Sequence, residues 1–414
     1  MRIAVVGGGA AGFFGAIQAA RQNPQAQVVI LEALAAPLTK VRISGGGRCN
    51  VTHHCFDPLL LSQHYPRGSG PLRGLFQRFQ PKDVLAWFAA EGVALKTEAD
   101  GRIFPESDQS ATIVRALVQA AQRAGVQIQT QHKVQAVQRQ GSEWVVTWQG
   151  GGLRCDRVLL ATGGSPQGYA MAQRLGHQIL SPVPALFTLQ MADPDLRALA
   201  GITVPQARLK WLDEPLRGPE RKHREQMGPL LITHWGISGP AVLRLSSWLA
   251  RSLHQCHYRG RVQVNWLANW SREQLHQRCQ VLRQQVARKS LGAYRPALDL
   301  PQRLWRYLLA AAHIPPNRRW AELSQQELER LLAHLTAQVH TVTGRGVFKE
   351  EFVTCGGIPW SEVDSRTMQS RVCPGLYLAG EILDMDGLTG GFNLQAAWTT
   401  GWVAGQALGA TDHG

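Results

Sequence analysis

Residues 3–12 read IAVVGGGAAG, so a short β-forming run leads directly into a cluster of glycines. Residues 13–21 then carry apolar side chains at helical spacing, and residues 27–31 form a second β-rich run. This order predicts a strand, a tight turn, a helix and a second strand. The glycines fit the pattern G-x-G-x-x-G: Gly7 allows the turn, Gly9 lets the backbone approach a pyrophosphate, and Gly12 lets the helix pack on the strand.

An acidic residue stands where such a fold needs one. Glu32 ends the second predicted strand, where a carboxylate accepts hydrogen bonds from ribose hydroxyls. Phosphates would then lie at the positive N-terminus of the helix. The sequence therefore predicts a dinucleotide site whose ligands are Gly7, Gly9, Ala10, Ala11, Gly12 and Glu32.

The C-terminal part of the chain favours FAD over a nicotinamide cofactor alone. Residues 375–381 read GLYLAGE, a buried strand that ends in glycine and an acid, and residues 387–396 form a glycine-rich turn that opens a helix. Such a helix start can place its amides against the pyrimidine edge of a flavin, where negative charge develops on reduction. The alternative, a simple turn before a terminal helix, explains one glycine and not three. The predicted ligands here are Gly380, Glu381, Gly390, Gly391, Phe392, Asn393 and Gln395.

A third glycine-rich segment, KVRISGGGRCN, spans residues 40–50. Three consecutive glycines flanked by arginines can wrap closely around a phosphate or a flavin edge. The alternative is a flexible surface loop, which fits less well directly after the strand that ends at Glu32. Further ligands are expected at the predicted strands 127–137 and 157–161. The full set is Arg42, Ser44, Gly45, Gly46, Gly47, Arg48, Asn50, Val134, Thr162, Gly163 and Gly164.

The changing sequence character along the chain predicts an α/β fold: a discontinuous Rossmann-like FAD-binding domain (residues 1–184 and 345–414) that is interrupted by two inserts. Residues 185–268 show short β-like runs with proline and glycine breaks, which indicate a small β-barrel. Residues 269–344 are helical, with capping boxes at Ser271 and Ser324. In the first domain we expect helices over 81–92 and 111–124, strands over 127–137 and 144–148, and a hairpin over 95–104 whose turn is Asp100-Gly101.

Charge is the most unusual property of the composition. The chain has 414 residues and a formal net charge of +15, with 44 Lys and Arg against 29 Asp and Glu. A polyanionic partner, either nucleic acid or an anionic membrane surface, explains this excess, and so does a basic proteome or a solubility effect. No apolar run is long enough to span a membrane. Seven scattered cysteines without a C-x-x-C pair suit a reducing cytoplasm and give no metal-ligand spacing.

Four motifs together resemble the BaiN/RdsA family of NAD(P)/FAD-dependent oxidoreductases: residues 44–50, the turn at 162–164, THWGISGP at 233–240, and the block 380–395. The resemblance covers essentially the whole chain. It implies a discontinuous FAD domain with an inserted barrel and helical subdomain. It also implies reduction of a uridine in large-subunit ribosomal RNA with FAD and NADH, or, in another branch, a reduction in bile-acid metabolism. The short segment 165–169 and Trp235 depart from the family pattern, and both changes bear on the substrate side.

Reduction of uracil would add a hydride at C6 and a proton at C5, so the site needs an acid. Cys49 and His234 are the candidates, and their alternatives are a packed thiol and a structural histidine. His53 and His54 read as loop residues. No second dinucleotide motif is visible, so we expect NAD(P)H to bind transiently at the open flavin face. Phosphate contacts are expected from Arg217, Arg221, Lys222, Arg224, Arg288, Lys289, Arg318 and Arg319.

Two other functions stay open at this point. One is reduction of a small unsaturated metabolite by the same flavin chemistry. The other is a flavin-stabilised factor that binds RNA without catalysis. Salt-sensitive affinity for RNA would favour an enzyme that reduces ribosomal RNA or a non-catalytic RNA-binding factor over a small-molecule reductase. Stimulation of NADH oxidation by RNA would then distinguish the enzyme from the non-catalytic factor.

Overall fold

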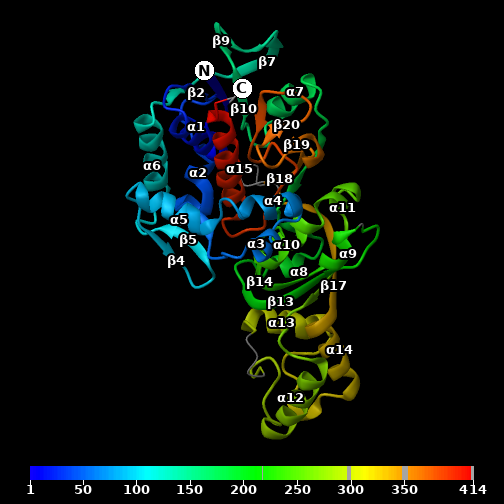
Figure 1. Cartoon of the computed structure of the whole chain (residues 1–414). Coiled ribbons are helices and arrows are strands. Elements are labelled where there is room, and N and C mark those ends of the chain that lie inside the picture. The colour runs from blue at the N-terminus through cyan, green and yellow to red at the C-terminus, as the bar shows by residue number, and fades with distance from the viewer. Residues whose placement is uncertain (217, 296–299, 347–352, 412–414) are drawn as a thin grey trace. The chain divides into compact units, whose positions relative to one another are not determined.

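A computed structural model describes residues 1–216, 218–295, 300–346 and 353–411 (Figure 1). The chain forms two compact units. The first comprises Met1–Pro182 and Val353–Gly414, and we call it the split unit; the second is Val183–Phe352, the insert unit. The expected class, an α/β dinucleotide-binding fold interrupted by a barrel and helices, is confirmed.

A seven-stranded sheet forms the centre of the split unit, in the order β19-β20-β21-β10-β1-β2-β6. Its five parallel strands pair in register, so that Val6 lies beside both Leu31 and Leu160, and Leu160 lies beside Leu378. Their carboxyl ends therefore meet at one edge of the sheet, where ligands bind in such folds. The strands are β1 (Arg2–Val6), β2 (Gln27–Leu31), β6 (Gln127–Gln129), β10 (Arg157–Leu160), β21 (Leu376–Leu378) and the antiparallel β19 (Val363–Asp364) and β20 (Gln369–Ser370).

Close helix packing brings the two ends of the chain together. Helix α15 (Phe392–Gly409) lies against α1 (Ala10–Gln22), as the red and blue helices in Figure 1 show. Gly401, Gly405 and Gly409 recur every fourth residue along α15. A Cβ on them would lie 2.4, 2.5 and 2.6 Å from carbonyl oxygens of α1. Any side chain at these positions would force the helices apart.

The predicted elements of the split unit largely match the structure, with two differences. The hairpin over 95–104 forms, but its loop spans Glu98–Gly101 instead of a two-residue turn. The prediction of a single strand over 127–137 is wrong. Gln131 adopts a positive φ of 59°, and the chain forms two strands, Gln127–Gln129 and Val134–Gln140, that belong to different sheets. The remaining elements are α2 (Thr39–Ile43), β3 (Thr52–His53), α3 (Pro58–Ser62), α4 (Ser69–Phe76), α5 (Pro81–Ala90), β4 (Leu95–Thr97), β5 (Arg102–Pro105), α6 (Ser110–Arg123), β7 (Val134–Gln140), β8 (Glu143–Trp148), β9 (Gly151–Cys155), α7 (Pro166–Arg174) and β18 (Val353–Gly357).

The insert unit contains a closed barrel in the order β12-β15-β14-β13-β16-β17. Strand β17 (Gln338–Arg345) lies in the range that the sequence pattern assigned to the helical insert. The alternation is inverted in its first half, because Gln338 and His340 face the interior while Val339 is half exposed. The other strands are β12 (Leu189–Met191), β13 (Thr203–Trp211), β14 (Glu225–Ile232), β15 (Gly236–Ser238) and β16 (Gly260–Asn265), and β11 (Leu180–Ala185) leads into the unit.

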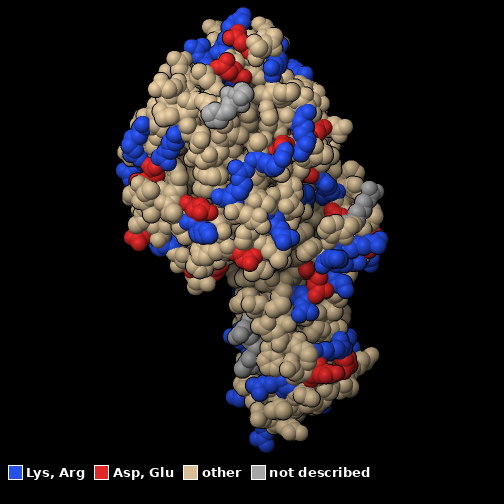
Figure 2. Space-filling view, viewed as in Figure 1, with Lys and Arg blue, Asp and Glu red and all other residues tan. Residues whose placement is uncertain are grey.

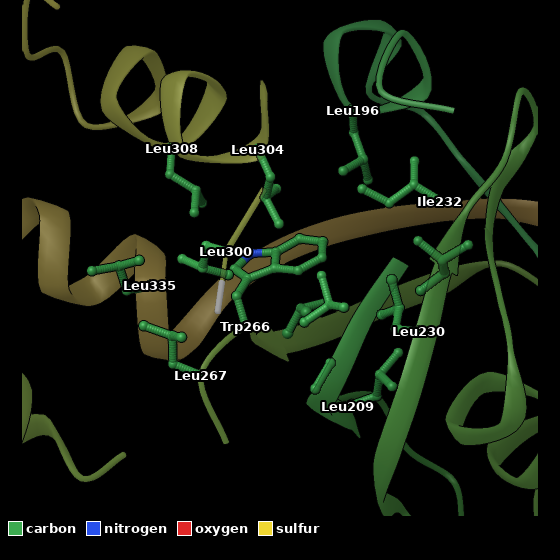
Figure 3. Packing of buried hydrophobic residues seen from close by; sticks show 14 of the residues in the cluster. Leu196, Leu209, Leu230, Ile232, Trp266, Leu267, Leu300, Leu304, Leu308 and Leu335 are labelled. Atoms are coloured by element: carbon green, nitrogen blue, oxygen red, sulfur yellow. The ribbon is translucent and has the colours of Figure 1, made fainter. Parts of the chain in front are cut away.

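Barrel and helices of the insert unit share one hydrophobic core. Figure 3 shows the fully buried Trp266 between Leu304 and Leu308 of a helix and Leu209 of the barrel. Its indole nitrogen donates to Gln338 Oε1 at 2.7 Å, which explains the inward-facing amide. Both predicted capping boxes form, at Ser271 and Ser324. The helices are α8 (Pro194–Arg197), α9 (Pro219–His223), α10 (Pro240–Trp248), α11 (Ala250–Gln255), α12 (Arg272–Gln285), α13 (Gln302–Ala311) and α14 (Gln325–Ala337).

Among the described helices, none combines the length and hydropathy that crossing a bilayer requires.

Candidate flavin site

The turn between β1 and α1 has the geometry that a pyrophosphate needs. A Cβ on Gly7 would lie 2.4 Å from the carbonyl oxygen of Ala161, and one on Gly12 would lie 2.0 Å from that of Gly7. By contrast, a Cβ placed on Gly9 would have no atom within 4 Å apart from those of Gly9 and its two chain neighbours. Gly9 is also the N-cap of α1 and offers no capping side chain, so the amides of Ala10 and Ala11 begin the helix uncapped. The turn therefore combines tight packing behind it with open space in front.

Backbone amides fix the carboxylate of Glu32 beside this turn. Its Oε2 accepts a hydrogen bond from the amide of Gly8 at 2.8 Å, and its Oε1 accepts one from Leu34 at 2.8 Å. These bonds hold the acid at the carboxyl end of β2, next to the phosphate turn. This is the placement expected for an acceptor of ribose hydroxyls.

The turn after β10 and the end of β21 contribute to the same edge of the sheet. Gly380 approaches α1 so closely that a Cβ would lie 2.9 Å from that of Ala11. The Oγ1 of Thr162 is buried and has no hydrogen-bond partner among the described residues. A Cβ on Gly163, whose φ is 60°, would lie 3.6 Å from Glu381 Oε2, and one on Gly164 would lie 2.7 Å from the hydroxyl of Thr354.

In the triple-glycine segment, Gly45, Gly46 and Gly47 are exposed and have positive φ values. Arg48 does not extend freely: its guanidinium lies 2.7 Å from Glu98 and 3.9 Å from the ring centroid of Phe104. Nearby, the backbone carbonyl of Arg42 accepts from Ser110, and the hydroxyl of Ser44 donates to Val41. The guanidinium of Arg48 is therefore already engaged by a carboxylate and an aromatic ring.

Side chains from both halves of the split unit hold the start of α15. In the amide orientation that satisfies both of its polar atoms, the Asn50 oxygen accepts a hydrogen bond from the backbone nitrogen of Gly391 at 2.9 Å, and its nitrogen donates to the carbonyl of Thr52 at 3.0 Å. The Oε1 of the fully buried Gln395 accepts a hydrogen bond from the hydroxyl of Thr52 at 2.5 Å. Asn393 closes the glycine turn through two bonds to Gly387. These side chains shape the turn and leave the amides of the first helical turn available for a flavin edge.

Two histidines contact the ring of Phe392 at this helix start. The ring of His64 stacks on Phe392 with centroids 4.1 Å apart, and His53 lies 4.8 Å from it on β3. Burial lowers the pKa of His53, and its Nδ1 is buried with no partner among the described residues. The sequence did not single out this cluster, because isolated histidines in loops give no spacing signal.

The remaining predicted residues lie in several places. Val134 begins β7, and its carbonyl accepts from Gln167 at 2.6 Å. Cys49 is fully buried at a positive φ of 64°, and burial raises the pKa of its thiol to about 12. His234 is exposed on the short connection between β14 and β15 in the insert unit, next to the exposed Trp235. Cys49 and His234 therefore belong to different units.

The family model described as "HI0933-like protein Rossmann domain" matches residues 1–407. The chain belongs to this family. The family resemblance drawn from the motifs is confirmed, because two curated relatives carry matching names. A 3-dehydro-bile acid delta(4,6)-reductase of Clostridium scindens is 31% identical over 414 residues, covering 98% of both chains. A ribosomal RNA dihydrouridine synthase of Escherichia coli is 29% identical, covering 98% of this chain and 97% of that protein.

A solved structure supports the fold over the full length. A 3-ketosteroid-delta4-(5alpha)-dehydrogenase from Rhodococcus jostii aligns with a TM-score of 0.51 at 15% identity, covering 99% of this chain and 96% of that one. At this identity the likeness concerns the fold alone.

FAD fits the site that the structure presents. The open space at Gly9, the uncapped start of α1 and the unpaired Thr162 hydroxyl lie along one edge of the sheet. The chain belongs to this family and is 31% identical over 98% of its length to a reductase of it, so the chain is an FAD-dependent oxidoreductase.

Proposed function

We propose that the enzyme reduces a carbon–carbon double bond conjugated to a carbonyl, and that its substrate is a uridine of ribosomal RNA. NAD(P)H would supply the electron pair. In the balanced reaction, a hydride adds to C6 of the uracil and a proton to C5, giving dihydrouridine and NAD(P)⁺. FAD supplies the hydride chemistry when bound. The protein must hold the base, exclude water and provide the proton.

The distribution of charge is the observation that carries the choice of RNA. Residues 183–352 contain 24 Lys and Arg against 13 Asp and Glu, a net charge of +11, whereas the rest has 20 against 16, a net charge of +4. Most of the +15 charge therefore belongs to the insert unit. The face in Figure 2 likewise shows more blue than red. A small neutral substrate gives no reason for such a concentration, but a polyphosphate backbone does.

The predicted phosphate-binding residues fall into two groups, according to whether their side chains have partners within the protein. Arg221 and Arg224 donate to backbone carbonyls, and Arg318 lies 3.3 Å from Glu327. Lys222, Arg288 and Lys289 are exposed, and no ion pair involves them within the described part of the chain. The second group is the better candidate for phosphate contacts, because no internal carboxylate competes for it. Arg217 lies outside the described residues.

The names of the relatives support both the proposed reaction and the proposed substrate. The Escherichia coli relative is named for dihydrouridine synthesis in ribosomal RNA, and so is one from Haemophilus influenzae at 26% identity. The names of the Escherichia coli and Clostridium scindens relatives imply reduction of conjugated double bonds. The same type of reaction is thus compatible with both kinds of substrate.

Of the two candidate proton donors, His234 is accessible and Cys49 is not. A thiol that is fully buried, with a pKa of about 12, has neither the access nor the acidity that the step needs. His234 is exposed, and the turn that carries it is held by two hydrogen bonds to the hydroxyl of Thr233. Cys49 then contributes packing beside the triple-glycine segment.

A small unsaturated ketone is the second candidate substrate. The observation in its favour is the 31% identity to the bile-acid reductase, which exceeds the identity to either RNA-related protein. Anaerobic turnover of the purified enzyme separates the two. With NADH or NADPH, we expect large-subunit rRNA lacking the modification to gain dihydrouridine, detected by nucleoside mass spectrometry. Rapid reduction of 3-oxo-4-ene steroids with no dihydrouridine in the RNA would refute the RNA proposal.

A further inference from the structure

A lysine that the predicted set of cofactor ligands omitted lies beside residues of the candidate flavin site. Lys40, on α2, places its Nζ 2.6 Å from Oε2 of Glu381. A Cβ on Gly163 would lie 3.9 Å from the same nitrogen. Three segments far apart in the chain, residues 38–40, 162–164 and 380–381, therefore meet around this ammonium group.

Two contacts place Lys40 next to the phosphate turn. The backbone nitrogen of Leu38 donates to the carbonyl of Gly8 at 2.8 Å, so the chain two residues before Lys40 is bonded to the turn itself. Gly380, which precedes the partner acid, contacts Ala11 in the first turn of α1. The segments that carry Lys40 and Glu381 thus both border the turn where the cofactor's two phosphates belong.

Charge balance gives this lysine a role. The site already contains the carboxylates of Glu32 and Glu381, and FAD adds two phosphate charges. Arg48 is occupied by Glu98 and Asp108. Lys40 forms an ion pair with one of these carboxylates, that of Glu381, and its side chain is 68% exposed and hence free to turn.

We propose that Lys40 is a ligand of the FAD diphosphate. Its ammonium group bridges Glu381 and a phosphate oxygen, which offsets the repulsion between them. Glu381 does not need Lys40 to stay in place, because its Oε1 also accepts from the backbone nitrogen of Thr354 at 2.9 Å. Lys40 can therefore turn toward the phosphate without releasing the acid.

Titration of the cofactor-free full chain with FAD, followed by flavin fluorescence, tests this role. We expect Lys40→Met to raise the FAD dissociation constant roughly 10- to 100-fold, and Lys40→Arg to keep it within about threefold. Lys82→Met, at an exposed lysine of α5, is the matched control and should leave it unchanged. Raising the salt concentration should weaken binding less in Lys40→Met than in the unmodified protein. Circular dichroism and thermal melting of the cofactor-free variants establish that they are folded.

The same substitution in a Glu381→Gln background distinguishes a phosphate ligand from a mere partner of Glu381. A direct phosphate contact predicts that Lys40→Met still weakens FAD binding beside Glu381→Gln, although the size of the loss changes because the two side chains are in contact. A dissociation constant within twofold of the unmodified protein in Lys40→Met, or a loss that vanishes beside Glu381→Gln, would overturn the proposal. Because the readout is cofactor binding, a failure of the uridine proposal leaves these expectations unchanged.

Discussion

The carbonyl oxygen of Gly7 lies 2.0 Å from the position that a Cβ on Gly12 would occupy. The first turn of α1 is thus pressed against the end of β1, and no side chain fits between them. At Gly9, two residues beyond Gly7, the surroundings are open instead. Gly12 and Gly9 therefore serve different purposes: Gly12 allows close packing, and Gly9 leaves room for the cofactor.

Alanine at these two positions should separate folding from cofactor binding. We expect Gly12→Ala to lower the free energy of unfolding of the cofactor-free protein by about 2–4 kcal/mol, because a backbone shift must relieve the clash. We expect Gly9→Ala to change it by less than about 1 kcal/mol and to weaken FAD binding at least roughly tenfold. Urea unfolding and FAD titration measure the two effects. Unchanged FAD affinity in Gly9→Ala would contradict the assignment of the phosphate turn.

Substitution of the two candidate acids should affect turnover very differently. Cys49→Ala should keep kcat within a few-fold, because the buried thiol, with a pKa of about 12, only packs. His234→Gln should lower kcat by roughly 10²- to 10⁴-fold if the imidazole donates the proton. Steady-state kinetics on the reduced substrate provide the comparison. The opposite ranking would return the acid role to Cys49.

His340 should make the stability of the insert unit depend on pH. Burial lowers its pKa from 6.5 to about 4, although Asp193 lies 3.8 Å away. The unfolded chain binds the proton more tightly, so this contribution is complete above about pH 6.5 and is lost as the pH falls toward 4. The loss is on the order of 3 kcal/mol.

Urea unfolding between pH 7.5 and 4.5 measures this dependence. His340→Gln should flatten the profile in that window, whereas the exposed His254→Gln should not. An unchanged slope in His340→Gln would show that other groups control the acid response.

Neutralising the unpaired basic residues of the insert unit should weaken RNA binding without altering FAD binding. For Lys222→Gln, Arg288→Gln and Lys289→Gln combined, the slope of log K against log salt should fall by about 2 to 3, because each phosphate contact contributes about 0.7 to 0.9. Filter binding of an rRNA fragment at several salt concentrations gives the slope. Combined Arg221→Gln and Arg318→Gln serve as the matched control, since both side chains have internal partners. Equal slopes in both triple and double variants would argue against a phosphate-binding surface at these residues.

The sequence predicted the central sheet well because the relevant signals are local. The apolar runs of β1 and β2 and the glycines at 7–12 are contiguous, and the structure matches their bounds. Strand β17 escaped detection because Gln338 and His340 face inward to satisfy Trp266 and approach Asp193. A polar interior reverses the alternation on which the pattern depends.

Side-chain roles in the site were less predictable than its location. Arg48 and Gln395 stood in the right motifs, yet their partners, Glu98 and Thr52, are far away in the sequence. Lys40 was overlooked for the same reason, since 341 residues separate it from Glu381. Such pairings depend on tertiary contacts that spacing does not encode.

The most direct test of the proposed function is the dihydrouridine content of large-subunit rRNA from a host strain that lacks the gene. We predict that nucleoside mass spectrometry of this RNA shows a loss of the modified base. The intact gene should restore it, and a Gly9→Trp variant, which fills the phosphate turn, should not. Unchanged dihydrouridine in the deletion strain, with no second family member in the host, would contradict the RNA substrate and favour a small unsaturated ketone.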